Sequence, residues 1–128
     1  MTNYEIMLKK AKEVSQNAYA PYSRFKVGAC ILTDTGNIYT GCNFENASYG
    51  LSICAERNAI GSAVAAGEKK IRAIAVYSPA QDNCYPCGAC RQVIYEFAFQ
   101  TGVDVITENN GKLVLTTITE LLPKGFSL

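Results

Sequence analysis

The chain of 128 residues is long enough for about one domain, which we expect to span residues 1–128. Hydrophobic residues make up 48% and charged residues 18% of it, which is ordinary for a globular protein and excludes a disordered or fibrous chain. The 12 basic and 11 acidic residues give a net charge of +1 without a run of like charge, so the basic surface of a nucleic-acid-binding protein is missing.

The first part of the chain predicts a helix followed by a pair of strands. Apolar residues recur at helical spacing over residues 3–18, and the helix stops before Pro21. Residues 25–33 are almost continuously apolar, as in a strand that is covered on both faces. A turn at residues 34–37 leads into a return strand at residues 38–42, so we expect these two strands to be antiparallel.

The rest of the chain alternates helices with strands. Small residues predict a helix over residues 54–66 that ends at Gly67, a strand follows at residues 71–77, and a second helix at residues 88–99. Two strands and a terminal turn complete the chain, at residues 103–106, 113–116 and 119–122. This alternation predicts a three-layer α/β/α sandwich with a mixed five-stranded sheet, and we expect its later strands to be parallel.

The sequence contains no histidine. This absence excludes Ser-His and Cys-His nucleophilic pairs and zinc sites built on imidazole. Proton transfer near neutral pH must then use a carboxylate, a thiol, an amine or a metal-bound water.

Nothing in the sequence directs the chain out of the cell or into a membrane. The N-terminal residues carry no long apolar stretch behind a positive cap, so they do not form a signal peptide. No segment reaches the roughly 18 uninterrupted apolar residues of a transmembrane helix. We therefore expect a cytoplasmic protein, in which clustered cysteines are more often metal ligands or catalytic groups than disulfides.

Reactive side chains concentrate in two short segments, Cys54-Ala55-Glu56 and Pro86-Cys87-Gly88-Ala89-Cys90. The CxxC pair of Cys87 and Cys90 can hold one metal between two thiolates, and Cys54 could supply a third. Both segments stand where helix N-termini are predicted, and backbone N–H groups there favour thiolate over thiol. Three thiolates on zinc leave a fourth position for water, which is typical of a catalytic site.

Other interpretations of these cysteines remain open. Cys84 forms a second CxxC pair with Cys87, so a structural zinc site with four sulfur ligands is one alternative, although Tyr85 and Pro86 make a tight turn there less favourable. Incidental buried cysteines without a metal are another. We expect Cys30 and Cys42 to be small buried side chains.

Glu56 is the remaining reactive group. A capping box would need Ser, Thr, Asp or Asn three residues earlier, where Ile53 stands. Near a metal-bound water the carboxylate suits proton transfer to a substrate. Arg57 and Arg91 each follow a motif directly, and we expect one of them to donate a hydrogen bond to a ligand sulfur and to offset its negative charge.

Five segments carry a resemblance to a known family, namely APYSRFKVGA, GCNFENASYG, CAERNA, PCGACRQV and LLPKGFS. Across residues 18–127, in order and in spacing, the chain resembles the small homotetrameric, zinc-dependent cytidine deaminases of the cytidine and deoxycytidylate deaminase superfamily. The resemblance implies their fold and the hydrolytic deamination of free cytidine and deoxycytidine to uridine and deoxyuridine, in pyrimidine salvage. Cys30 departs from the alanine that many relatives carry.

The resemblance also implies the roles of individual residues. One Zn²⁺ per chain would be held by Cys54, Cys87 and Cys90. Zinc-bound hydroxide would attack C4 of the base, while Glu56 takes the water proton, protonates N3 and helps ammonia to depart. Asn43 and Glu45 would reach the 3′-hydroxyl, and Phe25 would pack against the pyrimidine. The complete implied set of nucleoside-binding residues is Asn43, Phe44, Glu45, Phe25 and Ala55, with Ala47, Tyr49 and Phe126 contributed to a neighbouring subunit's active site.

Three other functions are alternatives to this interpretation. A deaminase for another amino-heterocycle, such as a blasticidin-type antibiotic or a guanine-like base, is the rival within enzymes. The Asn43-x-Glu45 pair favours an unphosphorylated ribose, because a carboxylate repels phosphate. A polynucleotide editor is disfavoured by the near-neutral charge. A non-catalytic module stabilised by zinc would have no use for Glu56. We expect a small nucleoside as the substrate, and neither nucleic acid nor membrane as a partner.

Overall fold

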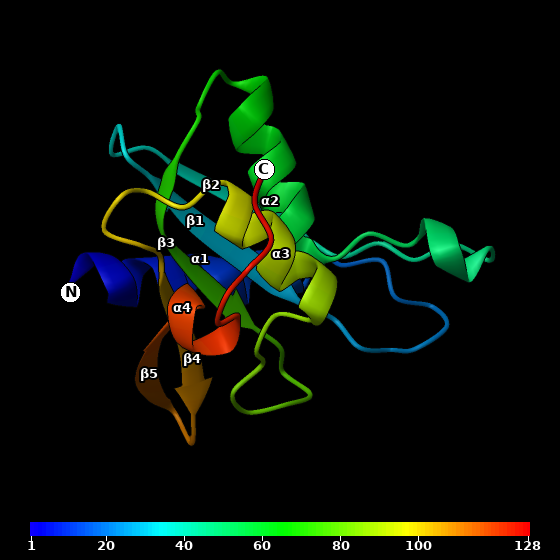
Figure 1. Cartoon of the computed structure of the whole chain (residues 1–128). Helices are drawn as coiled ribbons and strands as arrows, with labels where there is room; N and C mark the ends of the chain where they lie inside the picture. The colour runs from blue at the N-terminus through cyan, green and yellow to red at the C-terminus, as the bar shows by residue number, and fades with distance from the viewer.

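The computed structural model describes all of residues 1–128 and shows one mixed sheet of five strands (Figure 1). The sheet has the order β2-β1-β3-β4-β5. Its strands are β1 (Gly28–Thr33), β2 (Ile38–Cys42), β3 (Ile71–Tyr77), β4 (Asp104–Asn109) and β5 (Lys112–Thr117). The predicted strands at residues 38–42 and 71–77 are confirmed with the same bounds.

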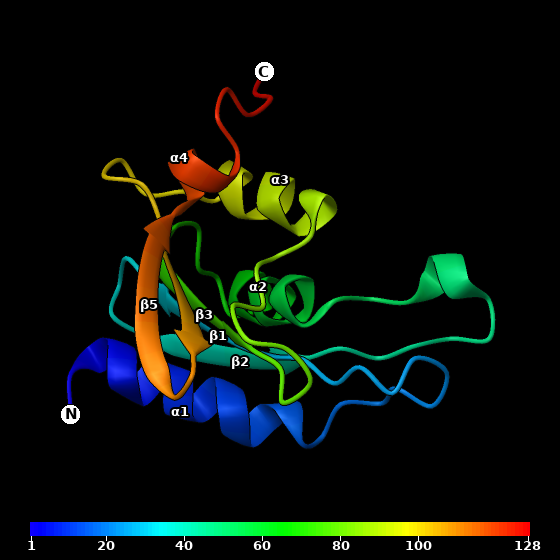
Figure 2. The same cartoon turned by 90° about the horizontal axis from the view of Figure 1, so that it is seen from below.

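Helices cover both faces of the sheet, so the predicted α/β/α sandwich is confirmed. Helix α1 (Asn3–Ser15) lies on one face, and α2 (Ala55–Ala65) and α3 (Gly88–Glu96) lie on the other, as Figure 2 shows. The 3₁₀ turn η1 (Tyr49–Leu51) lies between β2 and α2, and the short helix α4 (Ile118–Leu121) follows β5. None of these helices is long and apolar enough to cross a membrane.

Side chains that alternate between the two faces of the strands form a separate hydrophobic core on each face of the sheet. Successive side chains of a strand point to opposite faces. Accordingly Ala29 and Ile31 belong to the core beneath α2 and α3, while Cys30 between them is fully buried in the core beneath α1. Cys30 is therefore the small buried side chain that we expected.

The direction of the later strands differs from our expectation. Only β3 and β4 are parallel; β3 is antiparallel to β1, and β5 is antiparallel to β4. Asn110 and Gly111 join β4 to β5 with φ angles of 50° and 77°, which makes a two-residue hairpin turn that only antiparallel strands can use. The prediction of parallel pairing overlooked that Asn-Gly signal.

Several predicted boundaries move: α3 ends at Glu96 instead of position 99, and β4 reaches Asn109 instead of position 106. Two further boundaries move near the N-terminus. The first helix ends at Ser15, three residues before the predicted end at position 18. Strand β1 begins at Gly28, because the Val27 amide and the Phe25 carbonyl bond to the side chain of Asn43 and do not take part in a regular strand ladder. Gly67 ends α2 as predicted, with a φ of 94° that suits glycine.

Helix α2 packs on the sheet at a glycine. A Cβ atom added to the buried Gly41 of β2 would lie 2.5 Å from the backbone nitrogen of Ala59 and 2.8 Å from the carbonyl oxygen of Ala55. Both contacts are with helix backbone, which cannot rotate away. Glycine at position 41 therefore sets how close α2 approaches the sheet, and with it the position of the helix N-terminus.

We expect Gly41→Ala to lower the free energy of unfolding by about 2 kcal/mol or more, because the helix must move to admit the methyl group. Urea unfolding measures this change. Gly61→Ala is the matched control, since Gly61 lies on α2 with open space around it, and alanine there should stabilise the helix by up to about 1 kcal/mol. Equal effects of the two substitutions would contradict the close approach at Gly41.

Candidate active site

The N-termini of α2 and α3 meet at one point on the same side of the sheet. Cys54 is the N-cap residue of α2 and Cys87 that of α3, and neither side chain makes a capping hydrogen bond. The first backbone N–H groups of both helices are therefore left without the usual side-chain acceptor. Together with the positive helix ends, they favour negative charge on sulfurs placed there.

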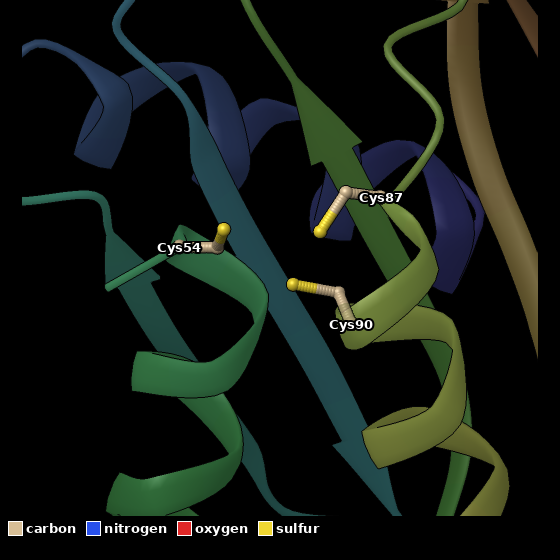
Figure 3. A group of neighbouring side chains, drawn as sticks. All are labelled: Cys54, Cys87 and Cys90. Carbon is tan, nitrogen blue, oxygen red and sulfur yellow. The ribbon is translucent and has the colours of Figure 1, made fainter. Parts of the chain in front are cut away.

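Three sulfurs converge between these helix ends. The side chains of Cys54, Cys87 and Cys90 point toward one another (Figure 3), and their Sγ atoms all lie within 4.8 Å of each other. Sulfurs in a tetrahedral zinc site, each about 2.3 Å from the metal, lie about 3.8 Å apart. A shift of less than about 1 Å would bring these sulfurs to that spacing, so both the donor set and its arrangement fit a zinc ion.

The cluster is already polarised before a cation binds. A hydrogen bond from Cys90 lowers the pKa of Cys54 to about 5, and Arg57 adds to this effect. The same contact with Cys54, together with burial, raises the pKa of Cys90, so Cys90 keeps its proton. A divalent cation replaces such protons when it binds thiolates. Zinc binding by this cluster therefore releases protons.

The two arginines that follow the motifs have different contacts. The guanidinium of Arg57 donates to Cys54 Sγ across 3.5 Å, and its buried Nε has no hydrogen-bond partner. Arg91 instead donates to the carbonyl oxygens of Pro86 and Leu121, at 2.7 Å and 2.9 Å. Arg57 thus lies against the sulfur cluster, whereas Arg91 ties the loop that carries Cys87 to helix α4.

Glu56 lies next to the sulfurs on the first turn of α2 and is only 4% exposed. Burial, with a further contribution from the charge on Cys54, raises the pKa of Glu56 to about 7. A carboxyl group with a pKa near neutrality can both accept and release a proton at physiological pH. The local environment therefore suits acid–base chemistry at this position.

A pocket of about 230 Å³ opens beside Glu56. Cys54, Cys87 and Glu56 line it together with Asn43 and Glu45. The remaining lining residues are Ser23, Phe25, Val27, Ala55, Cys84 and Tyr85. Cys84 is thus a pocket wall, and it does not belong to the group of cysteines whose sulfurs converge.

The polar groups of Asn43 and Glu45 are partly used within the chain. Asn43 accepts a hydrogen bond from the Val27 amide at 2.8 Å and donates one to the Phe25 carbonyl at 2.9 Å, which leaves one side-chain N–H free. Glu45 accepts three hydrogen bonds from Tyr22 and Ser23, which leaves about one of its four lone pairs free. Those contacts, the one from Ser23 first, hold the pKa of Glu45 below its usual range.

The structure gathers some of the predicted nucleoside-binding residues and not others. Phe25, Asn43, Glu45 and Ala55 line the pocket with Glu56. The other four, namely Phe44, Ala47, Tyr49 and Phe126, are exposed and do not line it. Tyr49 and Phe126 are the most exposed of these aromatic side chains, at 74% and 68%.

Three lining residues were not predicted from the sequence, namely Ser23, Val27 and Tyr85, and Cys84 was considered only as a fourth sulfur ligand. Ser23 and Val27 lie within the segment APYSRFKVGA, which carries the family resemblance, but serine in a turn and valine before a strand have no chemical signal of their own. Tyr85 could have been noticed, since it is a large aromatic residue directly beside a cysteine motif. Their place in the pocket follows from the three-dimensional arrangement alone.

Comparisons of the sequence and of the structure with known proteins indicate the same family. The family profile described as "Cytidine and deoxycytidylate deaminase zinc-binding region" matches residues 1–106. The chain is 42% identical over 123 residues to a cytidine deaminase of Sporosarcina psychrophila, which covers 96% of this chain and 90% of the relative. The crystal structure of cytidine deaminase from Burkholderia pseudomallei superposes with a TM-score of 0.89 at 45% identity, over 98% of this chain and all (100%) of that one.

One relative has a different substrate in its name. A blasticidin-S deaminase of Bacillus cereus is 41% identical over 113 residues, which covers 82% of this chain and 79% of the relative. That identity is nearly the same as the 42% to the cytidine deaminase above. Sequence identity therefore establishes the family, and the substrate has to be argued from the pocket.

We expect Arg57→Ala to weaken zinc binding by about 10-fold to 100-fold, because Cys54 loses the hydrogen bond and the positive charge beside its sulfur. Competition with a chromogenic chelator measures the affinity directly and needs no assay of activity. Arg72→Ala is the control, since Arg72 lies over the ring of Phe99, away from the cysteines. Zinc affinity unchanged in Arg57→Ala would show that the contact with Cys54 does not support the metal.

Proposed function

Because this chain belongs to the cytidine and deoxycytidylate deaminase family, we propose that it hydrolyses free cytidine and deoxycytidine to uridine and deoxyuridine in pyrimidine salvage. The observation that carries this proposal is the buried carboxyl group of Glu56 beside three converging sulfurs. Asn43 and Glu45 line the same pocket, and their polar groups support binding of a sugar. The reaction forms a C4–O bond, breaks the C4–N bond and releases ammonia.

The three cysteines hold one zinc ion per chain. When bound, zinc acidifies a water, so that a hydroxide nucleophile is available near neutral pH. Cys54 and Cys87 extend from helix N-termini whose N–H groups support their negative charge. Arg57 offsets part of the charge that three thiolates bring to the site.

Glu56 moves the protons of the reaction. Its carboxylate takes a proton from water and delivers it to N3 of the pyrimidine, which makes C4 more electrophilic. The second proton of that water passes through the same side chain to the exocyclic nitrogen, which then leaves as ammonia. A pKa of about 7 suits these steps, since neither the acid nor the base form is strongly favoured at physiological pH.

Asn43 and Glu45 in the same pocket favour a sugar hydroxyl. Asn43 has one free N–H and Glu45 about one free lone pair. A hydroxyl can accept from the first and donate to the second, whereas a phosphate oxyanion has no proton to donate and is repelled by the carboxylate. This supports a free nucleoside over a nucleotide.

The substrate is tested by following ultraviolet absorbance with cytidine, deoxycytidine, cytidine monophosphate and blasticidin S, with and without a zinc chelator. We expect turnover of both nucleosides, loss of turnover with the chelator and negligible activity on the monophosphate. Turnover of blasticidin S without turnover of either nucleoside would instead assign the chain a blasticidin-S deaminase activity. Turnover of the monophosphate alone would overturn the argument from Glu45.

Replacing Glu56 with Ala should reduce kcat for cytidine by about 10³-fold to 10⁴-fold, because the proton path is removed. Metal analysis of the same variant should still find one zinc per chain, since Glu56 is not a ligand. Glu96→Gln, an exposed carboxylate on α3, is the control and should behave as the unmodified protein. Substantial activity in Glu56→Ala would show that Glu56 is not the proton shuttle.

The active form is a homotetramer in which each site is completed by a neighbouring subunit. The segment between β2 and α2 reaches away from the body of the chain with η1 at its tip, in both views (Figures 1 and 2). Tyr49 and Leu51 on that segment are 74% and 62% exposed. Phe126 is also exposed, while its backbone is held by two hydrogen bonds to Gln92. Apolar side chains held outward in this way suit contact with a second copy.

Mixing two inactive variants tests this arrangement. Phe126→Ala should be nearly inactive because its neighbour's site lacks the ring, and Glu56→Ala should be inactive in its own site. Co-expressed chains that mix at random in a closed symmetric assembly should regain about a quarter of the active sites. Light scattering should show four chains per particle. If mixing restored no activity, Phe126 would contribute to the active site of its own chain.

The same cysteines support a cytoplasmic location. All six are free thiols, and the reducing cytoplasm keeps clustered thiols in the state that binds zinc.

A further inference from the structure

Ser23 lies in the turn that leads from α1 toward β1, at the part of the pocket that Glu45 lines. Arg24 in this turn has a φ of 59°, an uncommon value for a residue other than glycine, and its amide bonds to the carbonyl of Ala20 at 2.9 Å. The turn thus has a defined and slightly strained shape. It aims the Ser23 backbone and side chain at the carboxylate of Glu45.

Glu45 receives all of its internal hydrogen bonds from this turn. The amides of Tyr22 and Ser23 donate to Oε1 at 3.0 Å and 3.1 Å, and the hydroxyl of Ser23 donates to Oε2. Each carboxylate oxygen can accept about two hydrogen bonds. Oε1 is therefore fully used, and only Oε2 can accept a hydroxyl from a ligand.

The hydroxyl of Ser23 also has a fixed direction. Its oxygen accepts the amide of Phe25 at 3.0 Å, so its single proton is available for Glu45. Ser23 thereby links the carboxylate that faces the sugar to the backbone of the aromatic residue in the pocket wall. The same hydrogen bonds keep the pKa of Glu45 low, so the carboxylate stays charged and acts only as an acceptor.

We propose that Ser23 is a positioning residue that sets selectivity for the sugar hydroxyl, by holding Glu45 so that one lone pair of Oε2 faces the 3′-hydroxyl of the nucleoside. The inference rests on the proposed function, since it needs a nucleoside in the pocket. Ser23 itself does not touch the reacting atoms. Its effect passes through Glu45 and therefore requires a substrate that carries the hydroxyl.

The test measures kcat and KM on cytidine, 2′-deoxycytidine and 3′-deoxycytidine for the unmodified enzyme and for Ser23→Ala. We expect kcat/KM of Ser23→Ala to fall about tenfold on the two substrates with a 3′-hydroxyl, mainly through KM, as for the loss of one hydrogen bond to a charged group. On 3′-deoxycytidine the two enzymes should agree within about twofold. The midpoint of thermal unfolding should change little, because Ser23 is exposed.

Two further variants separate positioning from a general effect. Ser23→Thr keeps the hydroxyl and should restore the activity on cytidine. Ser62→Ala removes a serine hydroxyl on α2 that bonds only to the Asn58 carbonyl, and it should behave as the unmodified enzyme on all three substrates.

An equal penalty of Ser23→Ala on all three substrates would overturn the inference, as would no penalty or a penalty that follows the 2′-hydroxyl. Failure of Ser23→Thr to restore activity would also overturn it. These results are distinct from failure of the proposed function, which would appear as absence of cytidine turnover by the unmodified enzyme.

Discussion

The N-termini of α2 and α3 meet at one group of cysteine sulfurs, and this arrangement determines the chemistry of the site. Cys54 and Cys87 occupy the N-cap positions of α2 and α3, yet neither caps its helix with a side-chain hydrogen bond. The free N–H groups and the positive helix ends therefore act on the thiolates. A metal bound by those thiolates would in turn join the two helices. The glycine contact between β2 and α2 keeps one of these helix ends in place, so the packing of the sheet and the chemistry of the site are linked.

The pocket uses two glutamates in opposite ways. Glu56 is buried next to the sulfurs, and burial raises its pKa to about 7, so it can exchange protons. Glu45 receives three hydrogen bonds from the turn at Ser23, which lower its pKa and keep it charged. The environment of each side chain, and not its type, makes one carboxyl group suited to exchange protons and keeps the other charged as a hydrogen-bond acceptor.

Local patterns in the sequence were enough to predict most elements and the set of cysteines, because a CxxC pair and a helix start are short-range features. The antiparallel pair of β1 and β2 was predicted correctly from the turn between them. The strand order and the antiparallel pairing of β3 with β1 were not, because they depend on contacts between distant segments. The pairing of β5 with β4 could have been predicted from the local Asn110-Gly111 turn. Within the site, the sequence pattern and family resemblance predicted the residue types that do chemistry. The sequence did not predict a role for Ser23, because only the folded turn brings its hydroxyl into contact with Glu45. It also could not tell which side chains, such as Phe126, stay outside their own pocket.

We propose that zinc in the active protein would be bound by three cysteine sulfurs, which leaves one ligand position for water. X-ray absorption at the zinc edge of purified, active enzyme measures the ligands directly. We expect three sulfur neighbours at about 2.3 Å and one oxygen neighbour at about 2.0 Å. Four sulfur neighbours, which would bring Cys84 into the site, or full activity in protein that contains no zinc, would contradict it.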